Sequence, residues 1–320
     1  MKNIPLLLCI FLCVRVNGQT NYFVAEEEKI SIKQGTLSAI LFTPVNSKNP
    51  PVILIIAGSG PTDRDGNSPL LHGKNNSLLQ LADSLAKHGI ASLRYDKRGI
   101  GKSKADTIMK ESDITIDTIA DDAAKMYHWL KARGHDNIYI AGHSEGSLIG
   151  MMVATKENPK GFISLAGAGR KIRNIINEQL AGQLSSQLRT EFDNDLDSIE
   201  LGLSVTAVNP ALMSLLRPSI QPYMRSWLKL DPQKIIAQLH CPVLIAQGSK
   251  DIQVAMKDAD SLHAARPGSK LLIVKNMNHL FKEVLTDDRN DNLKTYSDPS
   301  YPVMSELVSG IVEFIKQTKN

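Results

Sequence analysis

Three residues far apart in the chain have side chains that could together perform nucleophilic catalysis: Ser144, Asp251 and His279. A serine hydroxyl is a poor nucleophile at neutral pH. It becomes reactive when a histidine accepts its proton and a carboxylate orients that histidine. Such a set would attack a carbonyl carbon and form an acyl-enzyme, provided that the surrounding elements bring the three side chains together.

Ser144 lies between Gly142 and Gly146 at the junction of two predicted elements. Residues 137–141 alternate β-branched and aromatic side chains and predict a buried strand, and residues 147–156 predict a helix with an apolar face. A serine at such a junction, with glycines close on both sides, is typical of a sharp turn that exposes the hydroxyl above the sheet. The alternative is an ordinary tight turn whose serine caps the helix.

Asp251 and His279 each follow a predicted strand, at residues 242–246 and 270–274. The order serine, aspartate, histidine is the order in which one family of serine hydrolases carries its triad, each member at the carboxyl end of a strand. Taken singly, Asp251 could be an ordinary turn aspartate and His279 a loop histidine. Their order and their matching positions favour a catalytic set.

Other histidines compete less well with His279 for the role of base. His72, in a loop near the predicted site, is the one rival. We expect the side chain of His143, beside the nucleophile, to point away from the site. His263 lies within a predicted helix, and His240 precedes a strand at the opposite end of the sheet.

Two backbone N–H groups are needed to stabilise the oxyanion of a tetrahedral intermediate. One is predicted to come from Glu145, the residue after the nucleophile. The other is predicted to come from Ser59, in the loop Ala57–Pro61 (A-G-S-G-P) that follows the strand at 52–57. Small residues there allow the backbone to approach a substrate. The alternative is a glycine-rich turn without a catalytic role.

For the charged residues close to these motifs we expect structural roles or exposure to solvent. Asp63 and Arg64 follow the glycine-rich loop, and we expect them either to pin it through an ion pair or to be solvated. Asp258 and Asp260 lie on the predicted helix after Asp251, where we expect both to be solvated.

The order of elements predicts an α/β fold. A hairpin at residues 26–43 precedes a regular alternation of strands and helices, which implies a mostly parallel central sheet with helices on both faces. Besides the elements given above, strands are predicted at 90–95 and 161–166, and helices at 78–87, 117–133, 258–265 and 304–316.

Residues 170–239 interrupt this alternation. They contain no convincing strand, several helical segments and four prolines, at 210, 218, 222 and 232. We expect a helical cap inserted between two parts of the core, 19–169 and 240–320. The alternative is a helical decoration away from the site.

The first eighteen residues resemble a secretory signal peptide. Lys2 precedes an apolar run over residues 4–16, and small residues stand before Gln19. The run of about thirteen residues is shorter than the roughly twenty that a membrane-spanning helix needs, so we expect no stable membrane anchor. The predicted location is the periplasm or the medium. Removing this segment leaves Cys241, which is expected to be a buried structural thiol.

Composition limits the partners. The 320 residues are 42% hydrophobic and carry a formal charge of +4, which falls to +2 without Lys2 and Arg15. No basic run is interleaved with aromatic residues, so nucleic acid is not an expected partner. No His, Cys and carboxylate cluster has the spacing of metal ligands, so no metal and no cofactor is implied. The oligomeric state is left open.

Over residues 27–317 the chain resembles the α/β-hydrolase fold superfamily, in a branch of carboxylesterases. That branch pairs an A-G-S-G-P-x-D-R-D-G-N loop, here Ala57–Asn67, with a G-H-S-E-G turn, here Gly142–Gly146. Residues 94–103 are similar to the strand-4 loop of the superfamily, D-x-R-G-x-G-x-S. Ala57 stands where many relatives carry histidine, which leaves the backbone N–H donors unaffected.

The resemblance implies a Ser-Asp-His esterase that acts on a small-molecule ester, with a preference for short acyl chains. Two alternatives remain open. The same triad could serve an amidase, a peptidase or an acyltransferase acting on cell-envelope material. A non-catalytic binding protein could also retain the fold, although a disused site would be expected to lose one of its three residues.

Overall fold

The computed structural model describes residues 22–33, 35–105 and 109–318. The predicted signal peptide, residues 1–18, lies outside the described residues. The strands are β1 (Phe23–Ile32), β2 (Gly35–Pro44), β3 (Val52–Ile56), β4 (Ala91–Tyr95), β5 (Lys104–Ala105), β6 (Ile138–His143), β7 (Gly161–Leu165), β8 (Val243–Gly248) and β9 (Lys270–Val274).

The α-helices follow the predicted alternation. They are α1 (Ser77–Lys87), α2 (Ile116–Ala132), α3 (Glu145–Glu157), α4 (Ile172–Gln179), α5 (Ser186–Glu200), α6 (Met213–Leu216), α7 (Gln221–Leu228), α8 (Pro232–Ile236), α9 (Met256–Ala265), α10 (Arg289–Lys294) and α11 (Ser305–Thr318). None of the described helices has the length and apolar character that crossing a membrane would require.

The sheet confirms the predicted fold class. Its strand order is β1-β2-β4-β3-β6-β7-β8-β9, with β5 paired to β2. The β1–β2 hairpin is antiparallel, β2 joins β4 antiparallel, and every later pairing along this order is parallel. The carboxyl ends of β3, β6, β8 and β9 therefore reach the same edge of the sheet.

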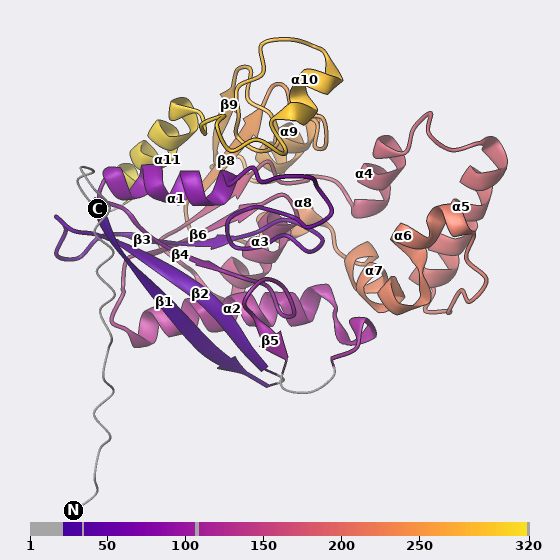
Figure 1. Cartoon of the computed structure of the whole chain (residues 1–320), viewed down its shortest axis with the longest axis horizontal. Coiled ribbons are helices and arrows are strands. Elements are labelled where there is room, and N and C mark those ends of the chain that lie inside the picture. The colour runs from indigo at the N-terminus through magenta and orange to yellow at the C-terminus, as the bar shows by residue number, and fades with distance from the viewer. Residues whose placement is uncertain (1–21, 34, 106–108, 319–320) are drawn as a thin grey trace, which may run out of the picture.

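Helices cover both faces of the sheet (Figure 1). Successive side chains of a strand point to opposite faces. On β3, Leu54 belongs to a buried cluster with Met126 of α2, whereas the neighbouring Ile53 belongs to a second cluster with Leu81 of α1. Helices α3, α8 and α9 contribute to the first cluster, and α11 contributes to the second. The short strand β5 and helix α10 were not predicted.

Helices α4, α5, α6 and α7, termed here the cap helices, lie to one side of the sheet and have a core of their own (Figure 1). That core is a small apolar cluster: Ile172, Ile175, Ile176, Phe192, Leu196, Ile199, Leu212, Leu216, Met224 and Leu228. The last helix of the predicted insertion, α8, packs differently, because Ile236 belongs to the cluster of the main core that also contains Leu54 and Met126.

Candidate active site

Ser144 occupies a tight turn between β6 and α3. Its backbone has φ 56° and ψ −121°, a strained conformation of the kind that structures retain mainly at functional sites. Neither of the two nearby glycines has room for a side chain. A Cβ on Gly142 would lie 2.0 Å from the carbonyl oxygen of Gly146, and one on Gly146 would lie 2.4 Å from that of Ile56. The turn therefore requires glycine both two residues before and two residues after Ser144.

Asp251 and His279 meet at the ends of β8 and β9. His279 Nδ1 lies 2.8 Å from Asp251 Oδ2, and both side chains are almost fully buried. Since the carboxylate accepts, Nδ1 carries the proton and Nε2 is left free to accept one. This is the tautomer that a general base needs.

The Asp251 carboxylate is held by several donors. Its Oδ1 accepts the N–H groups of Gln253 and Val254 at 2.8 and 2.9 Å, and its Oδ2 also accepts Gln247 Nε2 at 2.9 Å. Burial alone would raise the pKa of Asp251, but His279 and these backbone N–H groups outweigh it, so the pKa lies below its ordinary value. Asp251 is thus kept ionised and fixed in place.

The third link of the predicted triad is not formed in this structure. Within the described residues, Ser144 Oγ makes no hydrogen bond, to His279 or to another group. The two residues are nevertheless close, because His143, next to Ser144, bonds the backbone of His279. Catalytic hydrogen bonds are often long or absent until substrate binds. The rival His72 is exposed.

His143 contradicts one prediction, because it does not point away from the site. Its Nε2 donates to the carbonyl oxygen of His279 at 2.9 Å, and the two rings lie 4.7 Å apart between centroids. Burial and the neighbouring His279 lower the pKa of His143 to about 3, so its ring is neutral. Sequence reasoning missed this contact because its partners are 136 residues apart. His143 supports the loop that carries His279.

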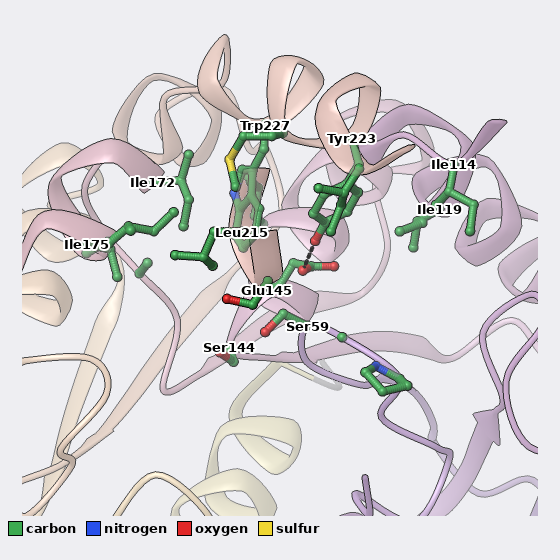
Figure 2. A pocket seen from close by; sticks show the side chains of 18 of the residues that line it. Ser59, Ile114, Ile119, Ser144, Glu145, Ile172, Ile175, Leu215, Tyr223 and Trp227 are labelled. Atoms are coloured by element: carbon green, nitrogen blue, oxygen red, sulfur yellow. Dashed lines mark hydrogen bonds between the residues drawn. The ribbon is translucent and has the colours of Figure 1, made fainter. Parts of the chain in front are cut away.

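The two predicted oxyanion donors flank the nucleophile. A Cβ on Gly58 would lie 3.2 Å from Ser144 Cβ, so the glycine-rich loop lies against the turn. Ser59, Ser144 and Glu145 line one cavity (Figure 2). In the described part of the chain, the N–H groups of Ser59 and Glu145 have no hydrogen-bond acceptor. Neither N–H group is therefore used by another part of the described chain.

An ion pair anchors the segment after the glycine-rich loop, and it involves Arg64 but not Asp63. Arg64 pairs with Asp96, which follows β4, at 3.1 Å, and the Arg64 N–H donates to the same carboxylate at 2.8 Å. Asp63 instead accepts the N–H groups of Asp65 and Asn67, each at 2.9 Å. The loop is thus tied to the neighbouring strand end.

Asp258 is a correction, because it is fully buried rather than solvated. It accepts Arg170 Nε and Nη2 at 2.9 and 2.7 Å and the N–H of Gly169 at 3.1 Å. This cluster fixes the chain where it leaves the core for the cap helices. Asp260 is exposed, as expected. Cys241 is buried, also as expected.

The cavity above Ser144 measures about 670 Å³ and is mostly apolar. Cap residues such as Ile172, Leu215 and Trp227 form one wall, and Ile119 of α2 lies opposite (Figure 2). The hydroxyl of Tyr223, on α7, donates to the carboxylate of Glu145. The insertion is therefore part of the cavity, and it touches the residue next to the nucleophile.

Comparison with known proteins supports this fold. A family described as serine aminopeptidase, S33 (Hydrolase_4), matches residues 69–197. Esterase EstD of Thermotoga maritima is 27% identical over 260 residues, which are 80% of this chain and 60% of EstD. A proline iminopeptidase of Saccharolobus solfataricus is 24% identical over 261 residues, 72% of this chain and 82% of that protein.

Among solved structures, Est1E from Butyrivibrio proteoclasticus with bound ferulic acid has a TM-score of 0.60 and 21% identity. The alignment covers 91% of this chain and 99% of Est1E. Together with the sheet order, these matches show that the chain has the α/β-hydrolase fold. The chain spans 60% of the length of EstD.

Proposed function

We propose that the protein is a serine hydrolase that cleaves carboxylic esters. The observation that carries the proposal is the buried Asp251–His279 pair, which lies next to a strained serine turn with two unused N–H donors. The similarity to EstD, which is named an esterase, supports ester cleavage. The cavity fits a small-molecule substrate with apolar groups.

The geometry supports a two-step acyl transfer. His279 Nε2 takes the proton of Ser144 as its oxygen attacks the ester carbonyl, and Asp251 stabilises the imidazolium. The N–H groups of Ser59 and Glu145 stabilise the oxyanion. The alcohol leaves with the proton from His279. Water then attacks the acyl-enzyme in the same manner and releases the acid.

The preferred acyl group is the finer part of the proposal. The resemblance to carboxylesterases implies short acyl chains, whereas a cavity of about 670 Å³ has room for larger apolar groups. Initial rates on p-nitrophenyl esters from two to sixteen carbons separate the two. We expect a peak between two and six carbons that is absent in Ser144→Ala. A peak above ten carbons would contradict the short-chain preference.

Amide cleavage is the second candidate, because one relative is named a proline iminopeptidase and the matching family a serine aminopeptidase. The same triad would then release an amine in place of an alcohol, and an acyltransferase would pass the acyl group to an acceptor other than water. Matched p-nitroanilide and p-nitrophenyl substrates distinguish these activities. Faster serine-dependent cleavage of the anilide would replace the ester proposal.

We also propose that residues 1–18 direct export and are then removed, so that the enzyme acts in the periplasm or the medium. N-terminal sequencing of the protein recovered from the cell envelope or the medium tests this. A mature chain that begins near Gln19 is expected, and an intact chain that stays in the cytoplasm would contradict it.

A further inference from the structure

A buried lysine holds the carbonyl groups on both sides of Ser59. Lys97 Nζ donates to the carbonyl oxygen of Gly58 at 2.5 Å and to that of Gly60 at 2.7 Å. Lys97 follows β4, the strand next to the one that leads into the glycine-rich loop. Its side chain is almost completely buried, and it also borders the cavity above Ser144.

We propose that Lys97 is a positioning residue that sets the oxyanion hole by fixing the peptide group between Gly58 and Ser59. In a trans peptide, the C=O of one residue and the N–H of the next point to opposite sides. Because the Gly58 C=O is turned toward Lys97, the Ser59 N–H is turned away from it. The inference rests on the proposed ester hydrolysis at Ser144.

The surroundings leave that N–H close to the nucleophile and without an acceptor. The loop lies against the nucleophile, since a Cβ on Gly58 would come within 3.2 Å of Ser144 Cβ. In the part of the chain that the structure describes, no acceptor is found for the Ser59 N–H. The Ser59 N–H is therefore held in place while making no hydrogen bond within the described part of the protein.

Within the loop, the Thr62 hydroxyl donates to the Ser59 carbonyl oxygen at 2.7 Å, but this bond fixes the 59–60 peptide and leaves the 58–59 peptide to Lys97. Glycine restricts the backbone least of all residues, and Gly60 adopts φ +67° with open space around its Cβ position. Two glycines flank Ser59, so rotation of the 58–59 peptide has little steric resistance from the loop. Hydrogen bonds from one ammonium group to both flanking carbonyls remove that freedom.

Two opposing influences act on the charge of this lysine. Burial lowers the pKa of Lys97, and the carboxylate of Glu145 opposes that effect. An ammonium group has three donors and no acceptor, so it favours carbonyl groups turned toward it and excludes the opposite orientation of the peptide. A neutral side chain of similar length would lack this preference.

The test is Lys97→Met, which keeps the length of the side chain and removes the donors. Removing one oxyanion donor typically lowers kcat by about 10²- to 10³-fold. We expect kcat on the best p-nitrophenyl ester to fall by about 10²-fold, with KM within about threefold of wild type. A trifluoromethyl ketone, which forms a tetrahedral adduct with the serine, should bind more weakly by a similar factor.

Lys282→Met is the matched control. Lys282 is a buried lysine whose Nζ also donates to a backbone carbonyl, that of Tyr301 at 2.7 Å. We expect the loss of either lysine to lower the melting temperature, but the loss of Lys282 should not selectively weaken trifluoromethyl ketone binding relative to KM. An equal weakening in both variants, or unchanged kcat and ketone binding in Lys97→Met, would overturn the proposal.

Wild type and Ser144→Ala in the same assays separate this inference from the proposed function. If turnover does not depend on Ser144, the proposed function and the role of Lys97 are both wrong. If it does, and Lys97→Met retains kcat, the positioning role alone is wrong. A crystal structure of Lys97→Met gives a readout besides activity. We expect the 58–59 peptide to be rotated or mobile, and an unchanged peptide would contradict the clamp.

Discussion

The sheet edge that carries Ser144, Asp251 and His279 and the cap helices above it hold their residues in different ways. At the sheet edge, buried groups fix one another, as Asp251 accepts two backbone N–H groups and the Gln247 amide besides His279. The cap helices have a separate apolar core, and the hydroxyl of Tyr223 donates to Glu145, the residue after Ser144.

From this difference we infer that the sheet edge carries out the reaction and the cap helices contact the rest of the substrate. A reaction that needs atoms placed within a fraction of an ångström is assembled on rigid strand ends. The wall that would contact the rest of the substrate is formed largely by a unit with its own apolar core, and we expect that its side chains can change without disturbing Ser144, Asp251 and His279. Variants at the sheet edge should therefore change the rate of reaction, and variants in the cap should change substrate preference.

The largest expected effect comes from Asp251→Asn. An asparagine would favour the wrong tautomer of His279, because its amide donates where the carboxylate accepts. We expect kcat to fall by about 10⁴-fold with little change in the order of preferred esters. The measurement is kcat over the series of p-nitrophenyl esters.

Asp258→Asn is the control for this variant, because it makes the same change in another buried aspartate, one that pairs with Arg170. Its kcat should stay within about tenfold of wild type, although stability falls. A comparable loss in both variants would mean that Asp251 acts only through the fold.

The next effect concerns the stability of the sheet edge at acid pH. The folded-state pKa of His143 is about 3, below its ordinary value, so the unfolded chain takes up a proton that the folded protein does not. The contribution of the neutral His143 to the free energy of unfolding is fully present above about pH 6.5. It falls by about 1.4 kcal/mol per pH unit as the pH drops from there toward the folded-state pKa of about 3.

Urea unfolding of wild type and of His143→Gln between pH 7 and pH 4 measures this effect. The glutamine amide can still donate to the backbone of His279 but does not titrate. We expect a shallower pH dependence in the variant. The same slope in both proteins would show that His143 does not carry the effect.

The smallest expected effect is in the cap. Tyr223→Phe removes the hydrogen bond to Glu145 and leaves the ring in the cavity wall. We expect KM to rise by about three- to tenfold for esters with large groups, with kcat nearly unchanged, because the ring that borders the cavity loses its anchor.

Tyr127→Phe is the matched control. Tyr127 lies on α2 and its hydroxyl is 3.5 Å from the carbonyl oxygen of Glu157, with no contribution to the cavity. It should leave KM unchanged across the series. A fall in kcat for Tyr223→Phe that is equal for all esters would erase the distinction between the two regions.

The contrast also explains what the sequence could predict. The fold class and the approach of Asp251 to His279 followed from strand periodicity and from the rule that parallel strands end at one edge. The contacts of His143 with His279 and of Asp258 with Arg170 join residues 136 and 88 positions apart. Such contacts leave no local pattern, because they depend on packing between elements. The same holds for Tyr223, whose partner is 78 residues away.

The central claim is that Ser144 is a nucleophile activated at this sheet edge, and covalent labelling tests it most directly. The folded protein would be treated with a fluorophosphonate and digested, and the modified residue identified by mass spectrometry. We predict one label, on Ser144, that is absent in Ser144→Ala and much slower to form in Asp251→Asn. Esterase activity that persists without a label on Ser144, or a label on another residue, would contradict the account.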